Sequence, residues 1–336
     1  MKLMTLMLLA VCFVLACSAT AQTYYVGTCH GAGYGTISAA VNAVPSGATI
    51  KVCPGTYPEQ LIITKPLTLA GFAVNGFSSA TIVGYEGAFA FTAYNGNVVR
   101  PSILVEAGPV NISDINIGAT YTTSDCVTRP AGIAYVSGSS GTVNHVNAAI
   151  VPAANCPLSV GVWIENEDMN VQTAVTVENS TIEVEDTGIW AYSGQQTGFA
   201  PITSLTATGN MISASYSIWV GTGVDVEMAE GTVSTNFIEA SLLGVVLNTN
   251  AAIKVNGNSV DASEGVLVEQ PAPTITNNKI RAGTGVYLNC NQATITGNTF
   301  LGGRDAQDST GIYFYPAALT GTNSFYNVAT EKFGPC

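Results

Sequence analysis

The chain has 336 residues and a formal net charge of −12, with 10 Lys and Arg against 22 Asp and Glu. Because contacts to nucleic-acid phosphates depend on Lys and Arg, this composition disfavours a nucleic-acid partner. The sequence is rich in Gly, Thr, Asn, Val and Ile, which favours strands and turns over helices.

Residues 1–21 have the features of a secretory signal peptide. An apolar run follows Lys2, and Ala19-Thr-Ala21 has the small-x-small form that signal peptidases cut. We therefore expect a secreted, periplasmic or cell-surface chain whose single domain spans 22–336. The alternative is lipoprotein processing, in which Cys17 would carry the lipid anchor. No later stretch is long and apolar enough for a transmembrane segment.

Residues 36–45 are expected to form a short helix, preceded by a first strand over 24–26. Thr36 suits the N-cap position. One face of this helix is apolar at the i, i+3, i+4, i+7 spacing, at Ile37, Ala40, Val41 and Val44. The end coil of a β solenoid exposes apolar surface and unpaired strand edges, so this helix suits a cap.

The segment 36–71 resembles the opening of right-handed parallel β-helices of the pectin-lyase-like superfamily. Pectin methylesterases and periplasmic β-helix proteins linked to copper-enzyme maturation begin similarly. The matching residues are Thr36-Ile-Ser-Ala-Ala-Val41, Pro45-Ser-Gly47, Ile50-Lys-Val52, Pro54-Gly-Thr-Tyr57, Glu59, Lys65-Pro-Leu-Thr-Leu69 and Gly71. The resemblance implies an all-β fold, a single-stranded right-handed parallel β-helix with a short N-terminal capping α-helix.

The catalytic motifs of the related enzymes are absent. Pectin methylesterases carry Gln-Ala-Val-Ala, Gln-Asp-Thr-Leu, Asp-x-Ile-Phe-Gly and Gly-Arg-Pro-Trp, and only the noncatalytic Gly55-Thr-Tyr57-Pro-Glu59 matches here. The polygalacturonase motifs Asn-Thr-Asp, Asp-Asp, Gly-His-Gly and Arg-Ile-Lys are also missing. The resemblance therefore assigns no catalytic residue, and the lack of a Gly-x-Ser-x-Gly arrangement disfavours serine-type hydrolysis.

Residues 253–300 repeat one pattern three times at a spacing of 20 residues. An apolar-x-x-Asn-x-apolar phrase is followed by a Gly-apolar-x-apolar phrase, as in Val255-Asn-Gly-Asn258-Ser-Val260 and Gly265-Val-Leu-Val268. Such repetition predicts the stacked coils of a solenoid. The template extends over about nine to ten coils and leaves 326–336 as a C-terminal tail.

The central Asn of the template recurs in consecutive coils. An Asn in a turn tolerates unusual backbone angles, and it can hydrogen-bond to its own backbone and to its copy in the next coil. We therefore expect a structural asparagine ladder at Asn210, Asn236, Asn258, Asn278 and Asn298.

The second phrase places one side chain per coil on the outer surface, because the residue between two inward apolar residues of a strand points outward. This outer row reads Ala134, Trp163, Trp190, Trp219, Val246, Leu267, Tyr287 and Tyr313. Its five aromatic residues would stack as a stripe that binds sugar rings. The alternative is that a loop, the C-terminal tail or another subunit covers them.

A second outer row contains charged residues: Glu183, Ser213, Glu239, Asp261, Arg281 and Leu301. Paired carboxylates next to a cation could divide the acid and base roles of a polysaccharide lyase or hydrolase. Glu239, Asp261 and Arg281 are therefore the candidate catalytic residues. The alternative is an exposed charge ladder with little energetic weight.

Two acidic groups follow the tryptophans: Glu165, Glu167 and Asp168, and then Asp225, Glu227 and Glu230. If they border the stripe, the result is an aromatic floor with acidic walls. Such a site favours neutral glycans, or acidic ones with a divalent cation. Glu165, Glu167 and Asp168 are the candidate Ca²⁺ ligands, although their spacing matches no EF-hand, and no other cofactor is expected.

Six cysteines follow residue 21, and an even number in an exported chain indicates disulfides. Cys126 and Cys156 fall in the same loop of adjacent predicted coils, and we pair them. Cys29–Cys53 would then tie the N-terminal cap, and Cys290–Cys336 the C-terminal tail. Metal binding by these cysteines is not indicated, because no C-x-x-C pair occurs.

Three function classes remain open. The first is recognition of extracellular polysaccharide along the aromatic stripe, without catalysis. The second is a polysaccharide lyase or hydrolase of the pectin or uronate class, using Glu239, Asp261 and Arg281 or the loop acids. The third is a structural or adhesive cell-surface solenoid whose aromatics form a subunit contact. The architecture does not choose among them, because it hosts many functions.

Overall fold

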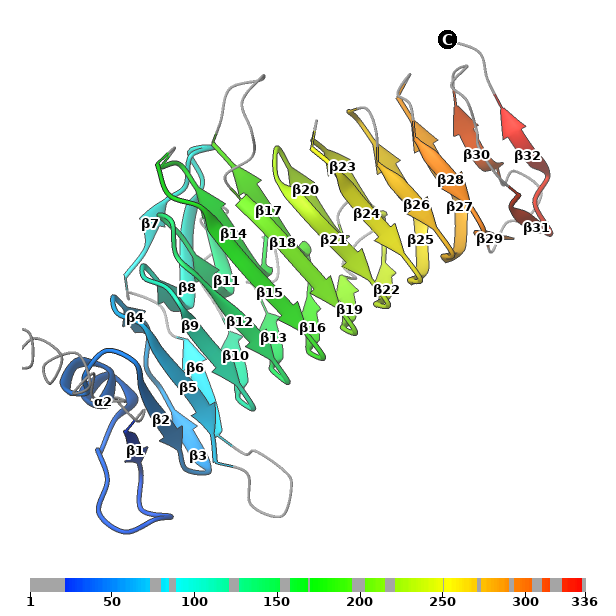
Figure 1. Ribbon diagram of the computed structural model, residues 1–336. Coiled ribbons are helices and arrows are strands. Elements are labelled where there is room, and N and C mark those ends of the chain that lie inside the picture. Colours follow the sequence, from blue (N-terminus) through cyan, green and yellow to red (C-terminus); the bar gives the residue numbers. More distant parts are fainter. Residues whose placement is uncertain are drawn as a thin grey trace, which may run out of the picture.

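The protein is a parallel β solenoid in the computed structural model, with coils stacked along one axis and the first and last described strands at opposite ends of the stack (Figure 1). The structure describes residues 22–72, 80–84, 89–120, 127–151, 158–168, 170–194, 203–214, 221–249, 251–270, 273–289, 293–303, 310–314 and 322–333. The expected right-handed parallel β-helix with one short helix is confirmed.

Each coil contributes strands to three faces. The first face is an 11-stranded parallel sheet. In spatial order it contains β1 (Thr23–Val26), β2 (Ala48–Val52), β5 (Leu67–Gly71), β9 (Val110–Ser113), β12 (Ser140–Asn144), β15 (Thr173–Glu178), β18 (Thr203–Thr208), β21 (Glu230–Ser234), β24 (Ile253–Asn256), β26 (Thr274–Thr276) and β28 (Thr294–Thr296).

The second face and the third face join into one 21-stranded sheet, because β25 (Ser259–Val268) and β27 (Lys279–Leu288) run across both. The other strands of the second face are β3 (Gly55–Tyr57), β6 (Ala80–Gly84), β10 (Asn116–Thr120), β13 (Asn147–Val151), β16 (Thr181–Val184), β19 (Met211–Ala214), β22 (Phe237–Ala240), β29 (Thr299–Gly302) and β31 (Ser324–Tyr326).

The third face positions the candidate site. Besides β25 and β27 it contains β4 (Leu61–Ile63), β8 (Val98–Val105), β11 (Thr128–Tyr135), β14 (Val160–Asn166), β17 (Thr187–Ser193), β20 (Thr222–Glu227), β23 (Leu243–Asn248), β30 (Thr310–Phe314) and β32 (Thr330–Phe333). The short β7 (Phe91–Thr92) pairs antiparallel with β8.

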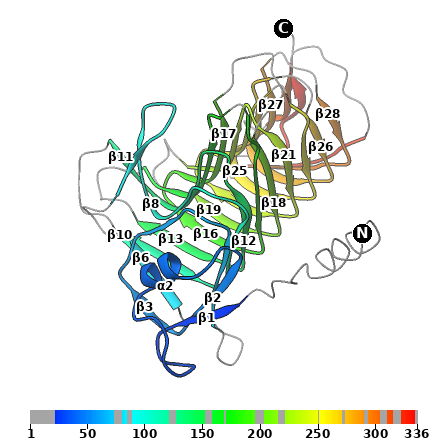
Figure 2. The same ribbon diagram turned by 60° about the vertical axis from the view of Figure 1, so that its left-hand side comes forward.

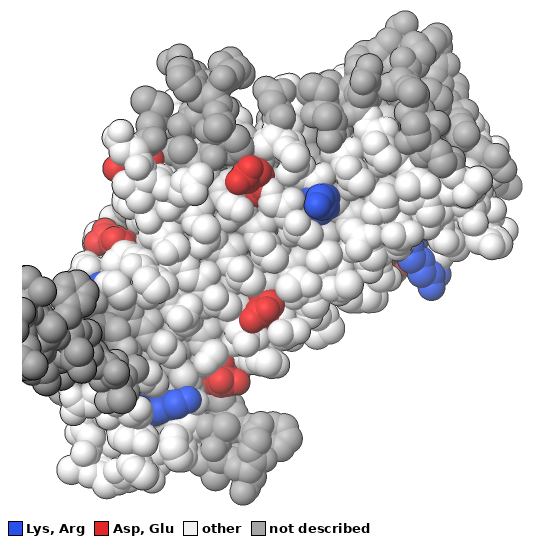
Figure 3. All heavy atoms as spheres, in the orientation of Figure 1, with Lys and Arg blue, Asp and Glu red and all other residues white. Residues whose placement is uncertain are grey.

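The face in view in Figure 3 is mostly uncharged, with a few Asp, Glu, Lys and Arg side chains spread over it.

The interior is one continuous apolar core that runs from Val26 to Ile312. Alternating Val, Ile, Leu and Ala side chains point inward along each strand, as expected for parallel sheets whose inner faces meet. At one corner the coils approach closely at a column of glycines. A Cβ added at Gly265 would lie 2.3 Å from Ile280 Cγ2 and 2.4 Å from the Gly285 carbonyl oxygen. Any side chain at this position would clash with the neighbouring coil, so the Gly-apolar-x-apolar phrase requires a glycine there.

Buried asparagines form a ladder along the corner between the first and second faces. The backbone N–H and the Nδ2–H of Asn236 both donate to Asn258 Oδ1, at 2.9 and 3.0 Å. Asn258 donates in the same way to Asn278 Oδ1, and its Nδ2 also reaches the Val233 carbonyl at 2.9 Å. The ladder begins at Asn210, passes through Asn278 and Asn298, and ends at Asn323.

The unusual backbone angle lies one residue before each ladder position, and not at the ladder asparagine itself. Thr235, Gly257 and Asn277 have φ values of 53°, 70° and 57°. His145 has φ 52° at the equivalent place before Val146. The expectation that the ladder asparagine itself adopts the awkward angle is therefore wrong: it supplies the hydrogen bonds, and its neighbour turns the chain.

Helix α2 (Ile37–Ala43) lies at the N-terminal end of the solenoid, within the predicted 36–45 (Figure 2). Thr36 Oγ1 accepts from the Ala39 N–H at 3.1 Å, as an N-cap does. The Glu59 carboxylate accepts from the N–H groups of Ile37 and Ser38, at 2.9 and 2.8 Å. This gives the Glu of the Gly-Thr-Tyr-Pro-Glu motif a structural role, because it satisfies free donors at the helix start.

The predicted Cys29–Cys53 disulfide is confirmed, and it ties the loop after β1 to the end of β2. The pairs Cys126–Cys156 and Cys290–Cys336 lie outside the described residues, as do residues 1–21 with Cys17. At the other end, β31 and β32 continue the sheets into the stretch predicted as a tail over 326–336. In the described part of the chain, no helix has the length and apolarity to cross a membrane.

The ladder predicts a large loss of stability on Asn258→Ala. The change removes the acceptor of two Asn236 donors and leaves a buried backbone N–H without a partner. We expect the free energy of unfolding to fall by about 3 kcal/mol, measured by urea denaturation. Asn147→Ala, at an exposed strand position, is the control and should change it little. Equal effects of both changes would contradict the ladder's role.

Candidate functional site

The outer row of the third face is continuous in the structure. Its register is Ala134, Trp163, Trp190, Asp225, Val246, Leu267, Tyr287 and Tyr313. The prediction is wrong at one position, because Asp225 and not Trp219 is the partner of Trp190. Trp219 lies outside the described residues.

The glycine column gives the reason for this error. Trp163 and Trp190 each stand two residues after a column glycine, Gly161 and Gly188, whereas Ser217 stands two residues before Trp219. Gly223 occupies the column in the next coil and sets Asp225 as the outer residue. Matching the glycine as well as the apolar residues would have found Asp225 from the sequence.

Trp163 and Trp190 are buried, although they point away from the solenoid core. Only 1% of Trp163 and 6% of Trp190 is exposed. They belong to a second apolar cluster, separate from the core, in which their ring centroids lie 3.7 Å apart. The expectation of an open aromatic stripe is therefore wrong at these two residues.

The cover is the β7–β8 hairpin. Phe91 of β7 meets Trp163 edge-to-face, with ring centroids 6.5 Å apart. The Tyr94 ring stacks on Tyr192 at 5.5 Å, and its backbone N–H donates to Glu165. A loop of the same chain thus covers part of the row.

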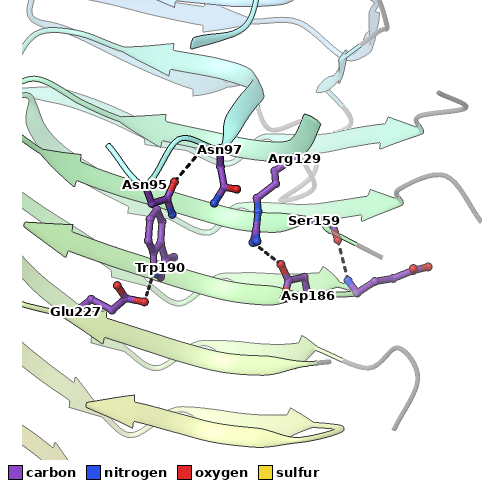
Figure 4. A network of polar contacts seen from close by, with 8 residues as sticks. Asn95, Asn97, Arg129, Ser159, Asp186, Trp190 and Glu227 are labelled. Carbon is purple, nitrogen blue, oxygen red and sulfur yellow. Dashed lines mark hydrogen bonds and ion pairs between the residues drawn. The ribbon is translucent and has the colours of Figure 1, made fainter. Parts of the chain in front are cut away.

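Glu165 and Glu227 hold the indole nitrogens of the two tryptophans. Trp163 Nε1–H donates to Glu165 at 2.8 Å. Trp190 Nε1–H donates to Glu227 at 3.3 Å, as Figure 4 shows. Burial raises the pKa of Glu165 to about 7, and the neighbouring Glu167 adds to the rise. Burial also raises the pKa of Glu227. Both carboxyls can therefore carry a proton closer to neutral pH than an ordinary glutamate.

Asp225, Asp186 and Arg129 extend this acidic group. Burial, together with repulsion from Glu227 and Glu269, raises the pKa of Asp225. Arg129 Nη1 pairs with Asp186 Oδ2 at 2.8 Å, reaching across the coils (Figure 4). Burial raises the pKa of Asp186 in spite of this cation. We call Glu165, Glu167, Asp186, Asp225, Glu227 and Glu269 the acidic cluster.

A cavity of about 200 Å³ opens beside Glu165. Its lining combines carboxyl groups with apolar side chains: Glu106, Glu165 and Glu167 together with Phe91, Leu104 and Val136, and also Thr92 and Ser137. The cavity thus lies between the covering hairpin and the outer surface of β14, and both aromatic and acidic side chains line it.

The row becomes more open toward the C-terminal coils. Leu267, Tyr287 and Tyr313 are half-buried. The rings of Tyr287 and Tyr313 are nearly parallel, at 7°, with centroids 5.0 Å apart. Here the predicted stacked aromatics are present and in contact with solvent.

Glu239, Asp261 and Arg281 are neighbours on successive coils of the second face, in the predicted register. Arg281 Nε lies 3.9 Å from Asp261 Oδ2, and both side chains are about half exposed. These features match the exposed charge ladder better than a catalytic group, because active-site carboxyls are usually set in partly desolvated surroundings.

Comparison with known proteins agrees with this fold. The family model described as "Right handed beta helix region" matches residues 160–329. The chain belongs to this right-handed β-helix family. No curated protein sequence matches the chain.

Among solved structures, this β-helix resembles the alginate lyase from Paenibacillus sp. str. FPU-7, with a TM-score of 0.52, 14% identity, and coverage of 93% of this chain and 98% of that one. The pectin methylesterase from Aspergillus niger in deglycosylated form gives a TM-score of 0.30 at 17% identity, covering 94% and 87%. The likeness to the alginate lyase concerns the fold and not the site.

The candidate Ca²⁺ ligands of the β-helix do not share one environment. Glu165 is buried against Trp163, whereas Glu167 and Asp168 are exposed. Asp168 Oδ1 accepts from the backbone and side chain of Asn170, which lowers the pKa of Asp168. Among the described residues, no group of three or more His, Cys, Asp and Glu side chains is arranged to hold a metal ion.

Removing part of the cover should expose the tryptophans. Phe91→Ala takes away the ring that meets Trp163 and should increase acrylamide quenching of tryptophan fluorescence. Phe237→Ala, at an exposed position of the second face, is the matched control and should leave quenching unchanged. If acrylamide quenches the fluorescence of both variants as it does that of the original protein, Phe91 does not shield the Trp163 indole.

The raised pKa of Glu165 predicts a pH-dependent stability. The folded state holds this proton more tightly than the unfolded chain, so the free energy of unfolding should fall as pH rises from about 4.5 to about 7. Asp225, Asp186 and Glu227 act in the same direction. Glu165→Gln should reduce this fall, measured by urea denaturation at several pH values. Glu183→Gln, on an exposed second-face position, should keep the full fall.

Proposed function

We propose that the protein binds an extracellular polysaccharide along the outer row of the third face. The observation that supports this proposal is that successive strands of one face carry both the half-buried pair Tyr287 and Tyr313 and the acidic cluster with its cavity. Strands in a sheet lie about 4.8 Å apart, so the row is an extended track. An extended polymer fits such a track better than a compact ligand does.

Unpaired polar atoms near the acidic cluster support a hydroxyl-rich ligand. Arg129 Nε is a buried donor and Asp225 Oδ1 a buried acceptor, and neither has a hydrogen-bond partner among the described residues. Buried polar groups are normally paired. A sugar hydroxyl both donates and accepts, so a glycan could satisfy groups of both kinds.

The related fold supports the same ligand class. The Paenibacillus protein is an alginate lyase and therefore acts on a polysaccharide. At 14% identity, this likeness supports the class of ligand but gives no residue its role. With residues 1–21 as a signal peptide, we place the protein outside the cytoplasm, where such polymers occur.

Cleavage of the polysaccharide is a second candidate function, favoured by the environment of Glu165. A carboxyl that keeps its proton near neutral pH can act as a general acid, and a second carboxyl can act as the base or nucleophile. Glu165 lines the cavity, and Glu227 belongs to the same cluster. The catalytic candidates thus move from Glu239, Asp261 and Arg281 to these two residues.

Binding is tested by isothermal titration of the mature chain with neutral, amino and uronate oligosaccharides. Tyr287→Ala and Tyr313→Ala should each weaken binding by about 3- to 10-fold, because an aromatic contact contributes about 0.5–1.5 kcal/mol. The control is Tyr326→Ala, an exposed tyrosine on the second face. Absence of binding to every oligosaccharide would refute the proposal.

Cleavage is tested by reducing-sugar release and by the absorbance of unsaturated uronate products. If the protein is an enzyme, Glu165→Gln should lower turnover at least about 100-fold, as expected for loss of a general acid, while binding is retained. Asp261→Asn and Arg281→Ala should leave the rate unchanged. Loss of turnover in these two variants would restore the second-face residues as candidates.

A further inference from the structure

The carboxyl groups of the acidic cluster repel one another. Glu227 and Glu269 both raise the pKa of Asp225, and Glu167 raises that of Glu165. Arg129 is the cation that lowers the pKa of Asp186 and of Glu227. Repulsion among these carboxyls makes their ionised forms less favourable, and an added negative charge would increase that repulsion.

The cavity beside Glu165 points to a ligand. Its volume is about 200 Å³, and its lining combines the carboxyl groups of Glu106, Glu165 and Glu167 with the apolar side chains of Phe91, Leu104 and Val136. A fitting group would be small, cationic at one edge and apolar on one face.

We propose that the polysaccharide carries free amino groups, and that an amino-sugar unit occupies this cavity with its ammonium group between Glu165 and Glu167. This inference rests on the proposed function and names the class of its ligand. An ammonium group supplies three donors and no acceptor, which matches carboxylate walls. The C–H groups of the sugar ring would face Phe91 and Leu104.

The same arrangement disfavours a uronate. A carboxylate on the sugar would add a like charge to the acidic cluster, and like-charge contacts oppose binding. The protein as a whole carries a net charge of −12, which also repels anionic polymers at a distance. The sequence alone suggested neutral or metal-bridged acidic glycans, whereas the buried carboxyls around the cavity select a cationic one.

The test compares three trisaccharides by isothermal titration: glucosamine, its N-acetylated form, and galacturonate. We expect the glucosamine form to bind at least tenfold more tightly than the acetylated form, with an affinity that falls as salt increases. Near pH 7 its binding should also release protons, because a cation favours the ionised form of Glu165. Titrations in buffers of different ionisation enthalpy measure this release.

Matched variants separate the cavity from the general charge of the protein. Glu167→Gln should weaken binding of the glucosamine form several-fold and leave binding of the acetylated form unchanged. Glu239→Gln removes one exposed carboxylate on the second face and should change neither. An equal loss in Glu239→Gln would show attraction by overall charge and overturn the inference.

The outcomes also distinguish this inference from the proposed function. Equal affinity for the amino and acetylated forms, both weakened by Tyr287→Ala, would keep polysaccharide binding and overturn the amino-sugar class. Tighter binding of galacturonate would do the same. Failure of all three trisaccharides and of longer oligomers to bind would overturn the proposed function itself.

Discussion

The asparagine ladder is the constraint on which the rest of the structure depends. Each buried amide satisfies a backbone N–H and a backbone carbonyl of the preceding coil, so it fixes where every coil starts relative to its neighbours. Since side chains alternate along strands, a shift of one residue would turn an outward residue inward. The ladder therefore decides which residues of each strand enter the core and which form the outer row.

The outer row has two different environments because the β7–β8 hairpin lies over one part of it. Beneath the hairpin, Trp163 and Trp190 form an apolar cluster, and the carboxyls that hold their indole nitrogens lose much of their hydration. Desolvation explains the raised pKa of Glu165 and Glu227. Away from the hairpin, Tyr287 and Tyr313 remain half-buried. One repeated strand position thus lies in a buried acidic region at one end and carries a half-buried tyrosine pair at the other.

The repeat made most of the fold predictable from the sequence. Local spacing located the ladder and the capping helix, because each depends on neighbouring residues or on the coil length. The Cys29–Cys53 pair followed from assigning the cysteines that remained after Cys126 and Cys156 were paired. The cover over the tryptophans could not be found this way. Tyr94 donates to Glu165 across 71 residues of sequence, from a hairpin that has no counterpart in the repeat. That long-range contact brings the hairpin against the buried Glu165. The misplacement of Trp219 has a local cause, because Ser217 stands where the Gly-apolar-x-apolar phrase requires a glycine.

The ladder has a consequence for how the length of this protein can change. The coils that end at Asn278 and Asn298 have the same length, and each passes identical donors and acceptors to the next. Duplicating residues 258–277 would therefore insert a complete coil whose amide pairs with unchanged partners above and below. The track on the third face would grow by about one strand spacing of 4.8 Å. Solenoids of this kind can be lengthened in evolution or by design one coil at a time, and the cap and the acidic cluster stay as they are.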